Sequence, residues 1–288
     1  QTMLEMICRT AGYISPKITL IVGFDKKSII EESKNFGLDI STCEQPAPIG
    51  TGDAVKCGIH EVKDASKVLI LYGDVPLIKQ NTIEELIKAS GDGLSILTTE
   101  LDDPYGYGRV KKNPEGYATG IIEEKDASNE EKEIKEVFTG ILCSSTKILK
   151  ESLSEIDNKN AAGEFYLTDI VSIMNNKGIK INTYLASNDE VKGANSKKEL
   201  AQLEAIYRSM KVEDLLNMGI TISDPNRLDV RGDVECGKDC SIDVNVILEG
   251  KIKLGDNVSI GANCIIKNTS IGSNSKIDAF SHIDGASI

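Results

Sequence analysis

Residues 254–266 read LGDNVSIGANCII, and this stretch decides the fold of the last part of the chain. Within it, Leu254, Ile260 and Ile266 stand six residues apart. The spacing extends in both directions over small or apolar residues, with one residue fewer before the last three: Cys236, Ile242, Leu248, then Ile271, Ile277 and Ile283. Three hexads make one triangular coil of a solenoid. The alternative, an antiparallel sandwich, repeats its strands roughly every 8 to 12 residues, so the spacing favours the start of a left-handed parallel β-helix.

The chain before Gly219 has a different pattern, in which helices and strands alternate. Helical spacing over residues 3–7 is followed by an apolar run over 18–22, and a second apolar run over 68–72 leads directly into Gly73 and Asp74. Further helices are predicted over 28–36, 81–89, 147–156 and 167–175, and further strands over 94–101, 117–123 and 137–143. Such alternation predicts a Rossmann-like α/β domain with a mostly parallel sheet covered on both faces.

The two patterns meet at a long helical segment over 197–218, which carries charges of both signs. We therefore expect an α/β domain over residues 1–196, a linking helix over 197–219, and the first coils of the β-helix over 220–288. A chain of 288 residues suits two domains.

Composition excludes several classes of partner. The net charge of -12, from 33 basic and 45 acidic residues, argues against nucleic acid or an anionic membrane as the main partner. No run of 18 apolar residues and no signal peptide is present, which predicts a cytoplasmic protein rather than a membrane-spanning or exported one. The seven cysteines are odd in number and scattered, as reduced thiols are.

Two stretches of the α/β region can carry chemistry. Asp74 follows a buried strand, at the sheet edge where ligands of open α/β folds bind, so it is a candidate metal ligand; a helix-capping aspartate is an equally good interpretation of this stretch alone. The loop over 45–54, QPAPIGTGDA, enters a helix, and its glycines allow backbone amides to approach a nucleotide closely. Taken alone, that signal is weak, because glycines before helices are often turn formers.

An ordered series of motifs resembles one family, the bacterial bifunctional N-acetylglucosamine-1-phosphate uridyltransferase and glucosamine-1-phosphate acetyltransferase. The motifs are QPAPIGTGDA at 45–54, YGDVPL at 72–77, LDDPYGYGR at 101–109, IIEEKDA at 121–127, GEFYLTD at 163–169 and EVKGAN at 190–195. Together with the hexads they cover essentially the whole chain.

The resemblance implies a reaction between UTP and N-acetylglucosamine 1-phosphate that forms UDP-N-acetylglucosamine and pyrophosphate. Asp74 and Asn195 match the ligands of a catalytic Mg²⁺, which prefers such oxygen donors. The implied substrate-binding residues are Gln45, Gly50 and Thr51 for uracil, Gly108, Glu123 and Thr168 for the amino sugar, and also Tyr72, Gly73, Phe138 and Asn195. No side-chain nucleophile or base is required, because alignment and charge neutralisation suffice.

Three departures from the family pattern qualify this expectation. The family's first strand and glycine-rich triphosphate loop precede the position of Gln1, and its further coils, with the acetyl-coenzyme A site, follow that of Ile288. His60 and His282 do not match the acetyltransferase histidine. Phe138 stands where the family has asparagine: either its ring faces the sugar and weakens binding, or it turns into the sheet and leaves affinity untouched.

The same resemblance implies a homotrimer assembled through the β-helix. Two other functions stay open at this point. One is a related glucose-1-phosphate uridylyltransferase, against which the motifs around Glu123 and Phe165 argue. The other is an inactive scaffold that only holds a nucleotide sugar.

Overall fold

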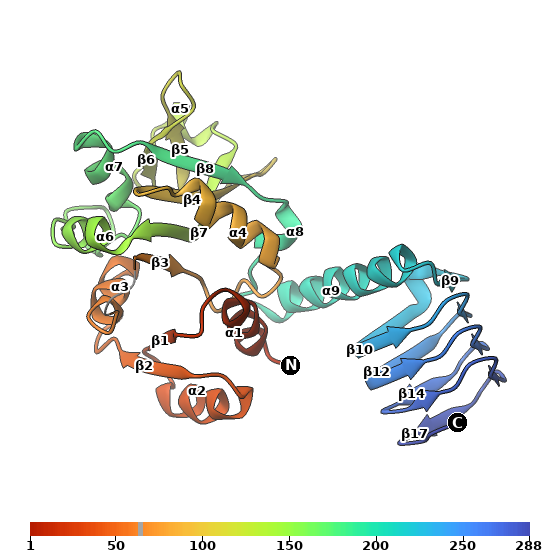
Figure 1. Ribbon diagram of the computed structural model, residues 1–288. Helices are drawn as coiled ribbons and strands as arrows, with labels where there is room; N and C mark the ends of the chain where they lie inside the picture. Colours follow the sequence, from red (N-terminus) through yellow and green to blue (C-terminus); the bar gives the residue numbers. More distant parts are fainter. Residues whose placement is uncertain (63–65) are drawn as a thin grey trace. The chain divides into compact units, whose positions relative to one another are not determined.

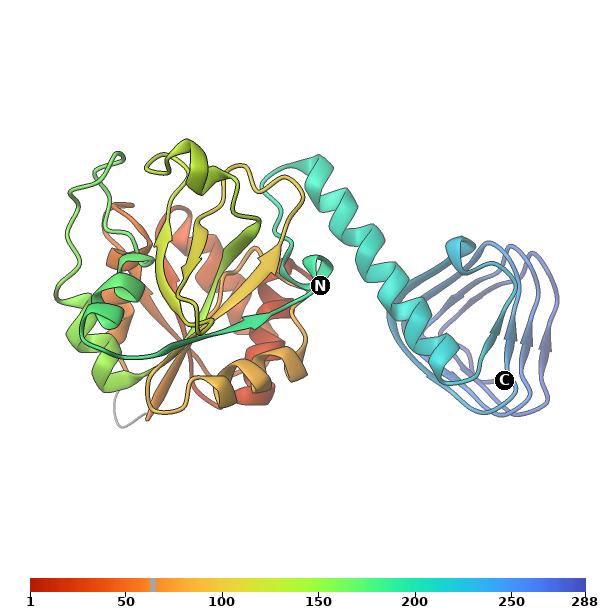
Figure 2. The ribbon, with the colours of Figure 1, turned by 90° about the horizontal axis from the view of Figure 1, so that it is seen from above.

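A computed structural model describes residues 1–62 and 66–288, which divide into two compact units, 1–194 and 195–288 (Figures 1 and 2). Within the described residues, no helix is both long and apolar enough to cross a membrane.

The first unit is built from helices and strands in alternation, as predicted. Its helices are α1 (Met3–Ile14), α2 (Lys26–Ser33), the 3-10 turn η1 (Lys34–Phe36), α3 (Thr51–Ile59), α4 (Gln80–Ala89), α5 (Asn129–Lys132), α6 (Thr146–Leu153), α7 (Asp169–Asn176) and α8 (Asn188–Val191). Its strands are β1 (Ile18–Val22), β2 (Ile40–Glu44), β3 (Lys67–Ile70), β4 (Leu94–Glu100), β5 (Arg109–Lys112), β6 (Ala118–Ile122), β7 (Glu136–Ser145) and β8 (Ile181–Leu185).

The main sheet has the strand order β6-β5-β7-β4-β8, with β3 paired to the last residues of β7. Four of its strands, β3, β4, β5 and β8, run in one direction, as a mostly parallel sheet requires, whereas β6 and β7 run in the other. Among the described strand pairs of this sheet, β4 with β8 is parallel and the other four are antiparallel. The long strand β7 runs against its neighbours β3, β4 and β5, a feature that the sequence pattern did not indicate. Strands β1 and β2 form a separate parallel pair.

Helices cover both faces of the main sheet. On one face, Val55 of α3, Leu149 of α6 and Met174 of α7 pack in one core cluster with Leu142 of β7. On the other, Ile7 of α1 and Leu86 of α4 pack with Ile141 and Cys143. The alternation of neighbouring residues along β7 between the two clusters is the period of a strand that is buried on both faces.

Strand β7 is interrupted where the chemistry is expected. Its pairing with β4 shifts between Ile96, opposite Leu142, and Thr98, opposite Phe138, so β7 carries two more residues than β4 over this interval. Gly140 lies within this bulge with φ +88°, a value that favours glycine. At the bulge, the Tyr72 ring lies against Gly140.

The second unit begins with the long helix α9 (Lys197–Asn217), whose Val212 and Leu215 join the core of the coils. The remaining elements are β9 (Thr221–Ile222), η2 (Pro225–Arg227), β10 (Leu228–Cys236), β11 (Ser241–Ile242), β12 (Val246–Leu254), β13 (Ser259–Ile260), β14 (Ile265–Lys267), β15 (Ser270–Ile271), β16 (Lys276–Ile277) and β17 (His282–Asp284).

The coils confirm the predicted β-helix. All strand pairs in the second unit are parallel, and Leu228 pairs with Val246, one coil of three hexads later. Lys253 pairs with Ser270, so the next coil has one residue fewer, as the shortened spacing before Ile271 requires. Wall residues such as Leu248, Ile260 and Ile266 are buried in a single core.

Candidate functional site

The loop that precedes α3 is held by Gln45. The side-chain nitrogen of Gln45 donates to the Gly50 carbonyl oxygen (3.1 Å) and to Oδ2 of Asp53 (2.9 Å). Its backbone N–H donates to Val22 at the end of β1. Because the amide nitrogen is occupied, Oε1 of Gln45 is the acceptor that remains for a ligand.

The two glycines of this loop lie against residue 165. A Cβ at Gly50, where φ is +123°, would lie 2.4 Å from the Phe165 carbonyl oxygen, and one at Gly52 would lie 2.9 Å from it. The close approach allows two backbone hydrogen bonds of 2.8 Å, from Phe165 N–H to Ile49 and from Gly52 N–H to Phe165. Glycine is therefore required here, so that the 45–54 and 163–169 motifs can pack together.

Tyr72 and Thr51 extend this contact towards β7. The Thr51 hydroxyl accepts a hydrogen bond from the Leu167 N–H (3.2 Å). It also forms a hydrogen bond with the Tyr72 side chain. Burial raises the pKa of Tyr72 to about 12, partly offset by that hydrogen bond. A Cβ at Gly140 would lie 2.6 Å from Cε2 of Tyr72, so the bulge in β7 makes room for the ring.

Asp74 lies in the turn after β3, next to Gly193. A Cβ at Gly193 would lie 3.6 Å from Oδ2 of Asp74. Asn195, two residues further along the chain, begins the second unit, and its backbone N–H donates to Oε2 of Glu199 (2.8 Å). The two predicted metal ligands therefore belong to different units, and their pairing stays a prediction. The described residues contain no cluster of three or more His, Cys, Asp or Glu side chains with metal-binding spacing.

The predicted amino-sugar residues Gly108, Glu123 and Thr168 lie together. Oγ1 of Thr168 donates to Oε1 of Glu123 (2.9 Å), and a Cβ at Gly108 would lie 3.6 Å from both carboxylate oxygens. Burial raises the pKa of Glu123 above its usual value, and the Thr168 bond opposes that shift. The geometry presents a half-enclosed carboxylate that can accept hydrogen bonds from a polyol or amide.

Phe138 is a core residue. Its side chain is 7% exposed and belongs to the hydrophobic cluster that contains Leu142, Ile170 and Met174. Of the two orientations considered for this ring, the structure has the one in which it packs into the sheet. Its backbone N–H nevertheless donates to the Gly108 carbonyl oxygen (2.9 Å), so the main chain of residue 138 borders the site.

Three charged residues near this site had no predicted role. Burial, followed by Asp157 and Glu123, raises the pKa of Asp169 to about 6. Arg109 is buried and forms a 2.7 Å ion pair with Glu124. All three residues lie within the motifs found in the sequence. The sequence could not reveal how far they are buried or which groups they contact, because their neighbours come from segments that are distant in sequence.

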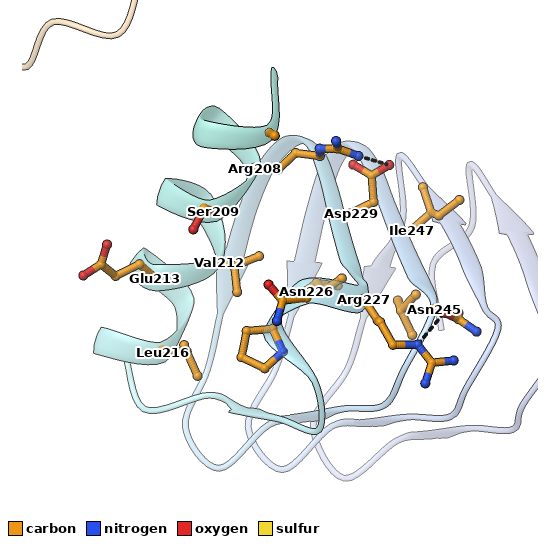
Figure 3. Close-up of a pocket in the computed structure, with 14 residues that line it drawn as sticks. Arg208, Ser209, Val212, Glu213, Leu216, Asn226, Arg227, Asp229, Asn245 and Ile247 are labelled. Atoms are coloured by element: carbon orange, nitrogen blue, oxygen red, sulfur yellow. Dashed lines mark hydrogen bonds and ion pairs between the residues drawn. The ribbon is translucent and has the colours of Figure 1, made fainter. Parts of the chain in front are cut away.

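Two cavities in the described part of the chain are lined by none of the predicted site residues. One, of about 210 Å³, is in the first unit and is lined by residues that include Tyr107, Thr139 and Lys192. The other, of about 540 Å³, lies in the second unit between α9 and the first coil (Figure 3). Arg208 faces Asp229 at 3.8 Å there, and Nε of Arg227 donates to Asn245 (3.0 Å). His60 and His282 are both exposed and outside the site.

Comparison with known proteins connects this geometry to one group of enzymes. Residues 1–138 match the MobA-like NTP transferase domain family. The chain is 42% identical over 289 aligned residues to the bifunctional protein GlmU of Burkholderia multivorans, and 41% identical over 282 to that of Neisseria meningitidis serogroup B. These alignments cover 99% and 97% of this chain, and 63% and 61% of the relatives. The chain thus spans less than two thirds of their length.

A solved structure shares the fold at low sequence identity. It is a nucleoside-diphosphate-sugar pyrophosphorylase from Vibrio cholerae, with a TM-score of 0.55 and 17% identity, aligned over 70% of this chain and 87% of that one. At this identity the likeness concerns the fold alone. Along nearly its whole length the chain is therefore similar to bifunctional GlmU proteins, and its first unit has the nucleotidyltransferase fold.

Proposed function

We propose that the chain forms UDP-N-acetylglucosamine and pyrophosphate from UTP and N-acetylglucosamine 1-phosphate. The observation that carries the proposal is the packing of Gly108 and Thr168 around the Glu123 carboxylate. The 42% identity to GlmU over 99% of the chain supports it. A half-enclosed carboxylate that accepts from a hydroxyl also suits the hydroxyl and amide hydrogens of an amino sugar.

The uridine part is assigned to the loop before α3. Oε1 of Gln45 is the acceptor for the ring N–H of uracil, and its side-chain nitrogen keeps the loop in place through Gly50 and Asp53. Thr51 and Tyr72 connect the loop to β7, so the nucleotide and the sugar are held by one rigid arrangement. Such positioning is the main requirement for phosphoryl transfer.

A Mg²⁺ ion is part of the proposal, with Asp74 and Asn195 as its protein ligands. Both offer hard oxygen donors, and Gly193, which has no side chain, lies beside the Asp74 carboxylate. The ion supplies neutralisation of charge on the phosphates. A phosphate oxygen of the sugar phosphate attacks the α-phosphorus of UTP and the bond to pyrophosphate breaks, so that no protein nucleophile takes part.

The wider assignment follows the full-length relatives. We propose a homotrimer assembled through the β-helix, with an acetyl-coenzyme A-dependent acetylation of glucosamine 1-phosphate in a protein of the relatives' full length. All seven cysteines are unpaired, which supports a reducing, cytoplasmic location.

The test is a coupled pyrophosphate assay with UTP, Mg²⁺ and either N-acetylglucosamine 1-phosphate or glucose 1-phosphate. Release that depends on the amino sugar supports the proposal. Faster release with glucose 1-phosphate contradicts the substrate assignment. Calorimetric binding of UDP-N-acetylglucosamine without turnover in either mixture identifies an inactive scaffold.

A further inference from the structure

Arg109, the first residue of β5, has a fully enclosed charged side chain, 2% exposed. Its Nη2 contacts Oε2 of Glu124 (2.7 Å), and its Nη1 donates to the Tyr107 carbonyl oxygen. Its Nε has no hydrogen-bond partner among the described residues.

Fold stability does not account for this arrangement. A buried donor without a partner is unfavourable, and apolar residues in place of a buried ion pair are often neutral or stabilising. Strand β5 would pair equally well with an apolar residue at 109, because the pairing of Arg109 with Ile122 and Val137 is made by the backbone. The guanidinium therefore has another role.

That role is visible in the turn before β5. Oε2 of Glu124 accepts from the Gly106 N–H (3.3 Å) as well as from Arg109. The ion pair therefore holds two neighbouring residues of the turn: Glu124 holds the Gly106 N–H, and Arg109 holds the Tyr107 carbonyl oxygen. The next residue is Gly108, which lies against the Glu123 carboxylate and accepts the Phe138 N–H.

Glu123 and Glu124 are neighbours in the sequence, but their carboxylates have different partners and different roles. The first faces Thr168 and the sugar site, while the second faces Arg109 and the turn. A shift of the turn moves Gly108 relative to the Glu123 carboxylate. We infer that Arg109, through Glu124, is a positioning residue that fixes the Gly106–Gly108 backbone for recognition of the amino sugar. This inference rests on the proposed function.

The test compares UDP with UDP-N-acetylglucosamine, which carries the sugar on its β-phosphate. Calorimetry gives the ratio of the Kd for UDP to the Kd for UDP-N-acetylglucosamine, which isolates the contribution of the sugar. We expect Arg109→Met to lower this ratio about tenfold, the effect of one or two lost hydrogen bonds, with the Kd for UDP nearly unchanged. Arg109→Lys keeps the charge but cannot contact Glu124 and Tyr107 together, so it should not restore the ratio.

Two further variants keep the test decisive if Arg109→Met folds poorly. Glu124→Gln removes the charge at a partly exposed position and should lower the ratio about threefold. Lys111→Met breaks the exposed Lys111–Glu131 pair (3.1 Å) on the same strand, without any contact to the turn, and should leave the ratio unchanged.

Equal weakening of UDP and UDP-N-acetylglucosamine binding in the Arg109 and Glu124 variants would identify a purely structural role and overturn the inference. An unchanged ratio would also overturn it. If the unmodified chain itself does not prefer UDP-N-acetylglucosamine to UDP, the proposed function fails first, and the inference with it.

Discussion

The Thr168 hydroxyl donates to Oε1 of Glu123 instead of capping its own helix. Thr168 is the N-cap residue of α7, yet its side chain makes no capping hydrogen bond. A threonine at this position normally stabilises the helix by accepting a backbone N–H. Here the hydroxyl orients the carboxylate of Glu123, the residue that directly follows β6, so Thr168 serves the site rather than the helix.

Replacing Thr168 with valine should therefore affect the site more than the fold. Because the Thr168 bond lowers the pKa of Glu123, its loss should raise that pKa further. Affinity for UDP-N-acetylglucosamine needs the ionised carboxylate, so its loss on acidification should begin at a higher pH in Thr168→Val. Calorimetry at a series of values between about pH 5 and pH 8 measures this. Superimposable pH profiles of the two proteins would contradict it.

Asp169 should make stability depend on pH. Its folded-state pKa is raised to about 6, so its ionisation opposes folding: the protein loses stability as the pH rises through that value. Asp169→Asn should be more stable than the unmodified chain at pH 7.5, by about 1 kcal/mol after allowance for solvent screening of this half-buried group. Urea unfolding at pH 7.5 and at pH 4 tests it. A difference that does not shrink at pH 4 would argue for another cause.

Gly140 should tolerate alanine less well than Gly116, although both have φ +88°. A Cβ at Gly116 meets nothing within 4 Å, so Gly116→Ala measures the backbone cost alone, about 1 kcal/mol. Gly140→Ala adds a clash with the Tyr72 ring and should be destabilised by about 2 to 4 kcal/mol in total. Equal denaturation midpoints for the two variants would show that the ring moves away freely.

Phe138→Asn should lower stability without improving sugar binding. The change removes an aromatic ring from the core and buries an amide there, with an expected loss of about 3 kcal/mol or more. Phe138→Leu, a matched apolar control, should lose about 1 kcal/mol. Denaturant unfolding and the Kd for UDP-N-acetylglucosamine are the measurements. Tighter sugar binding by Phe138→Asn would mean that residue 138 faces the ligand.

Asp74→Asn should abolish Mg²⁺-dependent pyrophosphate release while leaving stability nearly unchanged. Loss of the charged ligand removes several kcal/mol of charge stabilisation, at least about a hundredfold in rate. Asp92→Asn, at an exposed turn, is the control and should be as active as the unmodified chain. Release by Asp74→Asn within tenfold or so of the control would exclude Asp74 as a metal ligand.

The sequence by itself determined the two fold classes and the motifs. The hexads predict the β-helix directly, because each side of a coil needs one buried residue. The shortened interval before Ile271 corresponds to a coil that is one residue shorter in the structure. Helix and strand periods similarly identified an α/β domain, since both depend on neighbours along the chain. The roles of the predicted site residues in ligand binding stay predictions.

Only the tertiary structure decided what depends on partners distant in sequence. Strand direction follows from pairing, so β7 and its bulge at Gly140 had no local signal. A strand period cannot say which of two faces lies towards a ligand, so the place of Phe138 was open until its core neighbours were known. The same holds for Arg109, which faces Glu124, and for Glu123, which faces Thr168. The contribution of a charged side chain to stability or binding depends on the group that folding places next to it.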